Sequence, residues 1–276
     1  KTISGASAIA IPSLTISGTT TNNGTLTVST TLAGASTLTN GASGTLNFGG
    51  ASISPTLTAT AAGNVVNYNG TVAQAAKTTT YNTLKINNDA GVTLGAAITV
   101  TTLTIGDLTA NSIFLDGGYQ LTSTGTLNFV SGTYKLGSSS TATAFPAFTV
   151  TNFTSNTTVE YGCTKGNQTH IIASTPTYHN LTFSGASGKQ FSGSTTITGN
   201  YLQTSTSSGI VYLNVGATAY NFTVGGNFEV QEAPFIMQYV AGGLGATVTV
   251  AGTTTVSGTS VGYIQMDFGG AAVDKV

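Results

Sequence analysis

Few residues of this chain are of a type that supports catalysis or metal binding, and most of them lie in one stretch. The two histidines are His170 and His179, and Glu160 and Cys163 lie shortly before them. Imidazole, thiol and carboxylate groups are the usual components of zinc and thiol-dependent sites. None of the usual zinc-ligand spacings occurs among these residues, so we predict no metal site and treat Cys163 as a small packed residue.

The acidic residues give no better candidate for catalysis. Glu229 and Glu232 are the only close pair of carboxylates, and a separation of three residues puts them on opposite faces of a strand. Glycoside hydrolysis requires two carboxylates that face each other across a cleft. The chain also lacks a Gly-rich phosphate loop. We therefore predict that the protein is not an enzyme, with no catalytic residue and no cofactor.

The composition excludes several classes of partner. Of the 276 residues, 39% are hydrophobic and 5% are charged, and the net charge is −1. Nucleic-acid binding requires clustered Lys and Arg, whereas this chain has no Arg and its lysines are spread singly. No stretch approaches the roughly 20 apolar residues that span a bilayer. Low charge favours association between copies, because little self-repulsion opposes it.

The elements that must position these residues are short strands. Apolar and polar residues alternate in brief runs, such as Thr25–Thr30 and Ile98–Ile105, which are separated by Gly, Asn and Ser. These runs recur along the whole chain and no window has a capped helical stripe. The pattern predicts an all-β protein, and we favour a parallel β-solenoid because no linker divides the chain. The alternative is tandem antiparallel β-sandwiches.

The chain repeats part of itself. The segments Val66–Tyr68 and Thr80–Ile86, with Gln74 between them, return as Val159–Tyr161 and Thr177–Phe183, with Gln168 between them. Such internal repetition is typical of stacked structural units. The two repeats extend over residues 66–105 and 159–202. Because Asn82 takes the place of His179 in the first repeat, we expect His179 to lie in a surface turn.

Several of these segments carry a family resemblance. The segments Val66–Gln74, Thr80–Asn88, Gly132–Gly137 and Phe145–Phe148 together resemble repeat-rich secreted surface proteins of the Bacteroidetes and related bacteria. The resemblance covers roughly residues 63 to 230. It implies a β-helix, an adhesin-like role and an extracellular or cell-surface location, and it brings no catalytic residues.

The ends of a solenoid expose unpaired backbone groups and apolar side chains unless something covers them. We expect a strand segment at residues 1–20, a continuous solenoid at 21–260 and a strand or tail at 261–276. Both ends are apolar and nearly uncharged, so we expect one of them to pair with a neighbouring copy. The candidate assembly residues are Ile9, Ile11, Leu14, Ile16, Tyr263, Ile264 and Phe268.

Two hypotheses for the function follow. The first is a structural subunit of an extracellular filament or surface layer that assembles head to tail with copies of itself. The alternative is an adhesin module that binds a surface polysaccharide or another surface. Thr-X-Thr triplets such as Thr25–Thr27 also invite an ice-binding interpretation, but their spacing along the sequence is irregular, so we treat these threonines as ordinary strand-surface residues.

Overall fold

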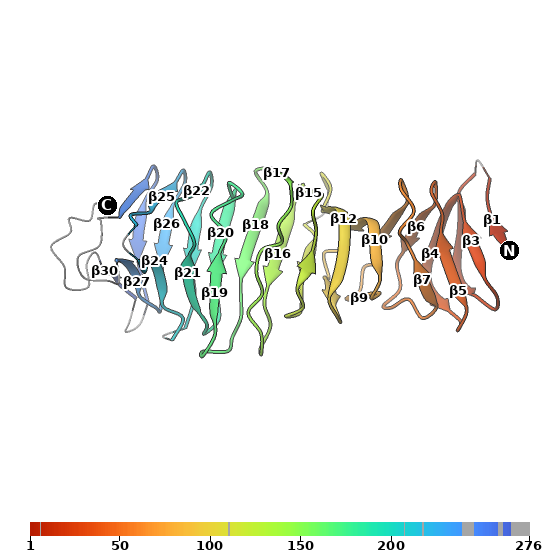
Figure 1. Ribbon diagram of the computed structural model, residues 1–276, viewed down its shortest axis with the longest axis horizontal. Coiled ribbons are helices and arrows are strands. Elements are labelled where there is room, and N and C mark those ends of the chain that lie inside the picture. The colour runs from red at the N-terminus through yellow and green to blue at the C-terminus, as the bar shows by residue number, and fades with distance from the viewer. Residues whose placement is uncertain are drawn as a thin grey trace. The chain divides into compact units, whose positions relative to one another are not determined.

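The computed structural model of the protein is all-β, with parallel strands stacked as a β-solenoid of about 12 turns, which we call coils (Figure 1). The structure describes residues 1–5, 7–109, 111–206, 208–216, 218–238, 246–258 and 262–265. Within these ranges no helix occurs, and thus none that would span a bilayer. The predicted solenoid is confirmed, and the antiparallel sandwich alternative is wrong because the strands pair in parallel.

The chain divides into two compact units. Unit 1 comprises Lys1–Tyr134 and Pro146–Thr154, and unit 2 comprises Lys135–Phe145 and Ser155–Val276. The strands of unit 1 are β1 (Thr2–Ile3), β2 (Ile9–Thr15), β3 (Thr20–Asn22), β4 (Thr25–Ala33), β5 (Thr37–Asn40), β6 (Thr45–Phe48), β7 (Thr56–Thr58), β8 (Val65–Tyr68), β9 (Gln74–Ala76), β10 (Thr80–Ile86), β11 (Val92–Leu94), β12 (Ile98–Ile105), β13 (Ile113–Leu115), β14 (Leu121–Thr122), β15 (Thr126–Phe129) and β17 (Val150–Phe153). Strand β16 (Gly132–Leu136) contains residues of both units. The strands of unit 2 are β18 (Thr157–Tyr161), β19 (Thr169–Ile172), β20 (Asn180–Phe183), β21 (Gly188–Phe191), β22 (Thr195–Ile197), β23 (Tyr201–Gln203), β24 (Val211–Asn214), β25 (Asn221–Val224), β26 (Phe228–Val230), β27 (Phe235–Gln238), β28 (Thr247–Val250), β29 (Thr254–Val256) and β30 (Ile264–Gln265).

Each unit is built from several parallel sheets whose strands come from successive coils. In unit 1 the strand orders are β2-β4-β6-β8-β10-β12-β15-β17, β1-β3-β5-β7 and β9-β11-β13. In unit 2 they are β18-β20-β23-β26-β29, β19-β21-β24-β27-β30 and β22-β25-β28. Neighbouring strands in such sheets lie about 4.8 Å apart, so equivalent side chains of successive coils are in contact.

The alternation of apolar and polar residues along each strand determines which side chains point into the core. In β6 the apolar residues Leu46 and Phe48 are fully buried, while Thr45 and Asn47 point outward. Because the strands pair in parallel, residues of the same kind lie next to each other in successive coils. One such row of fully buried side chains in unit 1 consists of Leu26, Leu46, Val66, Leu84, Leu103 and Leu127. Burial of each contributes roughly 1.5–3 kcal/mol, which makes these rows the main source of stability.

The longer strands turn a corner between two faces of the solenoid. In β12, Thr101 and Thr102 both point outward, which interrupts the strict alternation. Asn82 and Thr83 occupy the same place in β10. Asn82 thus lies within a strand, at the corner, whereas its counterpart His179, which we expected in a surface turn, lies half-buried in a bend.

Buried asparagines join three coils of unit 1. Asn22 Nδ2 donates to Asn40 Oδ1 at 2.8 Å, and Asn40 Nδ2 donates to the carbonyl oxygens of Gly44 (3.0 Å) and Val65 (2.9 Å). Asn64 Nδ2 in turn donates to the Asn40 carbonyl at 3.1 Å. Buried polar groups are stable only when they are hydrogen-bonded, and these amides bond one another and the backbone.

The two sequence repeats build the same buried tyrosine pair, one in each unit. The hydroxyls of Tyr68 and Tyr81 lie 3.2 Å apart in unit 1, and those of Tyr161 and Tyr178 lie 3.1 Å apart in unit 2. All four side chains are fully buried. Burial raises the pKa of Tyr68 and of Tyr161 to about 12 and also raises the pKa of Tyr81 and of Tyr178 well above its usual value, so the hydroxyls stay neutral hydrogen-bonding groups.

Replacing the central amide of the asparagine ladder should destabilise unit 1. We expect Asn40→Leu to lower the free energy of unfolding by at least about 2 kcal/mol, because it leaves several buried polar groups without a partner. Denaturant unfolding followed by circular dichroism measures this. The matched control is Asn152→Leu at an exposed position, where the change should stay within about 0.5 kcal/mol. Equal effects of the two substitutions would contradict a structural role for the ladder.

Candidate functional site

The predicted chemistry-bearing residues are partly brought together in the interior of unit 2. Cys163 is fully buried, as predicted, and His170 is 1% exposed. The Cys163 backbone N–H donates to His170 Nε2 at 3.2 Å, so the ring proton lies on Nδ1, which donates to the Thr143 carbonyl at 3.2 Å. Burial, and secondly the charge of Lys189, lower the pKa of His170 to about 4, which keeps the imidazole neutral.

The other candidates of the sequence lie elsewhere. His179 is half-buried directly before β20, and its Nδ1 has no hydrogen-bond partner among the described residues. Glu229 Oε1 accepts a hydrogen bond from Gln231 Nε2 at 2.6 Å, and Glu232 lies in a bend with φ of 47°. Within the described ranges no group of three or more His, Cys, Asp or Glu side chains is arranged to hold a metal ion.

Sequence reasoning missed the most unusual member of this interior cluster. Lys189 is fully buried, and its Nζ donates to the carbonyl oxygens of Ser184 (2.5 Å) and Ser187 (2.7 Å). Burial is the main cause that lowers the pKa of Lys189 to about 7, although the nearby Cys163 and Glu160 act in the opposite direction. Lysines are almost never fully buried, so a lone Lys in a sequence is ordinarily placed on the surface.

The internal repeat contained the signal that locates this cluster. Aligned on the repeats, Lys189 stands where the first repeat has the buried Val92. His170 pairs with Lys189 as Gln74 pairs with Val92, so His170 stands where the first repeat has the buried Gln74. The second repeat thus adds a buried lysine at an apolar position and replaces one buried polar residue by another. Beside them, Lys135 Nζ and Glu160 Oε1 form an ion pair at 2.6 Å.

The buried polar groups predict how stability depends on pH. Unfolded, His170 binds a proton that it lacks when folded between pH 4 and 6.5, and Lys189 does so between pH 7 and 10.5. Stability therefore rises with pH across both windows, by up to about 1.4 kcal/mol per pH unit for each group. Tyr68 and Tyr161 act oppositely between pH 10 and 12, where only the unfolded hydroxyls ionise. Unfolding midpoints should peak near pH 10.

Lys189→Val is the matched variant for this measurement, because the first repeat already has valine there. We expect it to remove the rise between pH 7 and 10.5. The loss of stability below pH 6.5 should become smaller but persist, because burial still lowers the pKa of His170 while the charge of Lys189 no longer does. A wild-type stability that is flat between pH 7 and 10 would show that the Lys189 ammonium is as well accommodated in the folded chain as in water.

A second candidate site is a threonine face on unit 1. One row of threonines runs across seven successive coils: Thr2, Thr21, Thr39, Thr58, Thr80, Thr99 and Thr122. A second row, two residues earlier in each coil, consists of Thr19, Thr37, Thr56, Thr78, Ala97 and Gln120. All of these residues are half-buried or exposed. Between the rows Leu38, Leu57, Ile98 and Leu121 are buried, and Thr79 is half-buried.

The register of this face corrects an expectation drawn from the sequence. The threonines of the first row are separated by 18 to 23 residues, which is irregular along the chain. In the fold they are direct neighbours, because the loops absorb the differences in length and the strands pair in register. The expectation that irregular spacing prevents an even threonine array is therefore wrong.

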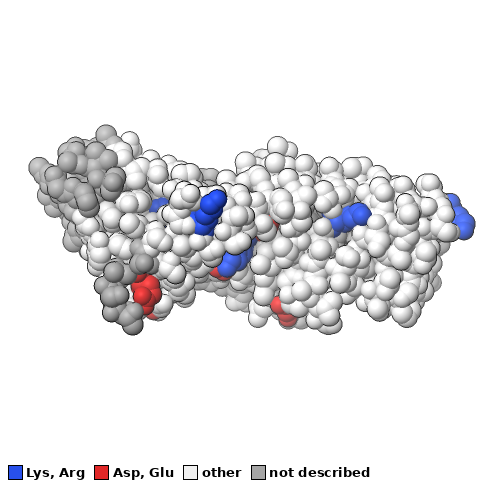
Figure 2. Space-filling model, turned by 90° about the horizontal axis from the view of Figure 1, so that it is seen from below, with Lys and Arg blue, Asp and Glu red and all other residues white. Residues whose placement is uncertain are grey.

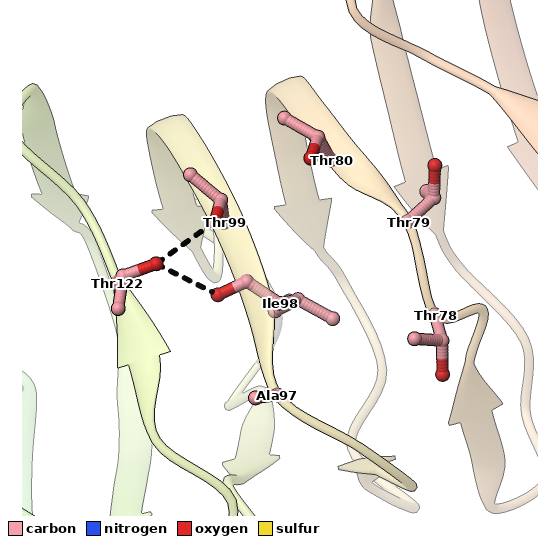
Figure 3. Close-up of a pocket in the computed structure, with 7 residues that line it drawn as sticks. All are labelled: Thr78, Thr79, Thr80, Ala97, Ile98, Thr99 and Thr122. Carbon is pink, nitrogen blue, oxygen red and sulfur yellow. Dashed lines mark hydrogen bonds between the residues drawn. The ribbon is translucent and has the colours of Figure 1, made fainter.

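Part of the threonine face is hollowed. The hollow has a volume of about 300 Å³ and lies between β10, β12 and β14 (Figure 3). Thr80, Thr99 and Thr122 project from these three neighbouring strands. The hydroxyls of Thr99 and Thr122 lie 2.9 Å apart, and Thr122 also donates to the Ile98 carbonyl at 3.3 Å. No charged side chain lines the hollow.

A third candidate is the first coil, where the predicted assembly residues Ile9, Ile11 and Leu14 lie on β2. Among the described strands β2 pairs only with β4, whose matching residues are fully buried. Ile9 is 40% exposed, and Ile11 and Leu14 are half-buried. Ile16 differs, because it is 3% exposed and its backbone N–H donates to the Ala33 carbonyl at 2.8 Å.

The candidate assembly residues near the C-terminus are Tyr263, Ile264 and Phe268. Tyr263 is 45% exposed, Ile264 is half-buried and pairs with Phe235, and Phe268 lies outside the described residues. At the other end, β1 pairs with β3 and β2 pairs with β4. Residues before position 20 thus share sheets with residues after it, and the boundary predicted there stays a prediction.

The fold places the chain in the class of parallel β-solenoids. Comparison with known protein families, with curated proteins and with solved structures finds no match. The resemblance to repeat-rich bacterial surface proteins therefore stays a prediction. On the face drawn in Figure 2, charged side chains are scattered over a predominantly uncharged surface.

Proposed function

We propose that this protein is a structural subunit of an extracellular filament or surface layer, and that copies join end to end by strand pairing at β2. The observation that carries the proposal is the apolar row of β2, beyond which no described strand lies. Ile9, Ile11 and Leu14 continue rows that are fully buried one coil further on. A strand laid against β2 would cover these side chains and pair its free backbone groups.

A second copy of the chain is the occupant that this edge favours. In the last described coils β29 is exposed throughout, and Val256 is 47% exposed. Among the described strands, β29 is the last of its own parallel sheet, as β2 is the first of another. When two different ends pair, each added copy leaves a free end that can bind another copy. Such pairing generates a filament rather than a closed oligomer. Pro12 lies inside β2 where its register shifts, so pairing would run along Ile9–Ile11 and Ser13–Thr15.

The composition and the interior support a structural rather than a catalytic role. With 5% charged residues, copies repel one another little, and a chain without Arg offers few sites to trypsin-like proteases outside the cell. The groups best suited to acid–base chemistry, His170 and Lys189, are enclosed and hydrogen-bonded in the core of unit 2.

Electron microscopy of the purified chain tests the assembly. We expect regular filaments, and we expect the double variant Ile9→Asp, Leu14→Asp to remain monomeric, because it places two charges in the proposed contact. Sedimentation and circular dichroism establish that the variant is folded. The matched control is Leu108→Asp at a 95% exposed position, which should assemble as the wild type does.

Two results would overturn the proposal. One is a wild-type chain that stays monomeric at high concentration while it binds immobilised polysaccharide, which is the behaviour of an adhesin module. The other is a double variant that still forms wild-type filaments, which would exclude β2 from the contact.

A further inference from the structure

The threonine face is a regular two-dimensional array. Adjacent threonines of one row are about 4.8 Å apart. In β5 and β7 the two rows are separated by two residues of strand, roughly 6.7 Å, whereas Thr19 and Thr78 of the second row lie just before β3 and β10. Threonine is branched at Cβ and therefore stiff at χ1, so the array has little conformational freedom to lose on binding. Four successive coils carry threonine in both rows, and the first row continues over the remaining three.

Most hydroxyls of the face are available to a ligand. Among the described residues, the protein provides no hydrogen-bond partner for the hydroxyls of Thr21, Thr39, Thr58 and Thr80, whereas Thr99 and Thr122 bond each other. Each free hydroxyl has one donor and two acceptor positions. A partner that both donates and accepts at every position therefore fits the array.

The side chains of the threonine face exclude some classes of binding partner. No charged and no aromatic side chain belongs to either row. An anionic polymer would require cations, and a sugar ring would gain most from an aromatic ring to stack on. What remains is a neutral and rigid partner that repeats at the spacing of the strands.

We propose that the threonine face of unit 1 binds the surface of ice. Ice is neutral and periodic, and each water molecule in it both donates and accepts hydrogen bonds. The ranked hydroxyls would occupy water positions of the crystal surface, while the methyl groups between them exclude liquid water. Each contact is weak, but rigid linkage of many contacts makes the whole array bind. This inference does not depend on the proposed assembly, which uses a different surface.

The neighbouring face of the same coils provides an internal contrast. There Asn47 Nδ2 donates to Thr27 Oγ1 at 3.3 Å, and Asn67 Nδ2 donates to Asn47 Oδ1 at 3.0 Å. These side chains bond one another, and the charged Lys85 continues the same row. That face therefore lacks the uniform, unpaired hydroxyls of the threonine face, although it belongs to the same coils.

Partition into slowly frozen ice tests the proposal. We expect the wild-type chain to be enriched in the ice fraction and to shape growing ice crystals. Thr58→Tyr and Thr80→Tyr place a bulky ring in the middle of the array and should each reduce the enrichment at least about tenfold, because they break the continuity of the contacts. The matched control is Thr102→Tyr, which lies on β12 but on the neighbouring face and should bind ice as the wild type does.

A conservative second variant protects the test against misfolding. Thr58→Val keeps the size and branching of the side chain and removes one hydroxyl, so it should fold and weaken the enrichment.

Exclusion of the wild-type chain from ice would overturn the proposal, as would an equal loss for Thr102→Tyr. Retention on microcrystalline cellulose or chitin that Thr58→Tyr abolishes, without retention in ice, would assign the face to a polysaccharide instead. Since Ile9→Asp, Leu14→Asp should still bind ice, failure of this proposal is distinct from failure of the assembly proposal.

Discussion

In-register pairing of parallel strands is the constraint on which the rest of this structure depends. Once one coil is placed on the next, every side chain is stacked on its counterpart about 4.8 Å away. Apolar residues then form rows that exclude water, such as the row through Leu46 and Leu84. Polar residues form ladders in the same way, and the buried asparagines around Asn40 bond one another from coil to coil. A residue type that occurs at the same place in successive coils therefore forms a continuous surface or hydrogen-bond network.

The same constraint explains how one scaffold supports different interiors. The two repeats build equivalent tyrosine pairs, yet the second has Lys189 in the place of Val92. The lysine is accommodated because two backbone carbonyls accept from its ammonium, while burial lowers its pKa. The backbone of a solenoid is held by its ladders, so the core tolerates a polar substitution when loop carbonyls are within reach.

The outer faces follow from register as well. Strands such as β12 turn a corner at Thr101 and Thr102, which gives one coil two faces with different chemistry. One face has uniform threonine rows, and its neighbour has amides that bond one another. The apolar row of β2 belongs to a third kind of surface, the end of the stack, where the ladder has no further strand among those described.

The sequence by itself determined the strands, the parallel solenoid and the equivalence of the two repeats, because alternation and repetition are local properties of the chain. It also determined the burial of Cys163 and the apolar character of β2. Only the tertiary structure decided which threonines meet, because loops of unequal length conceal the register. It also decided that Lys189 is buried and that Asn82 lies at a corner of a strand. These depend on which coil packs against which, and such long-range pairing is not encoded in the spacing of neighbouring residues.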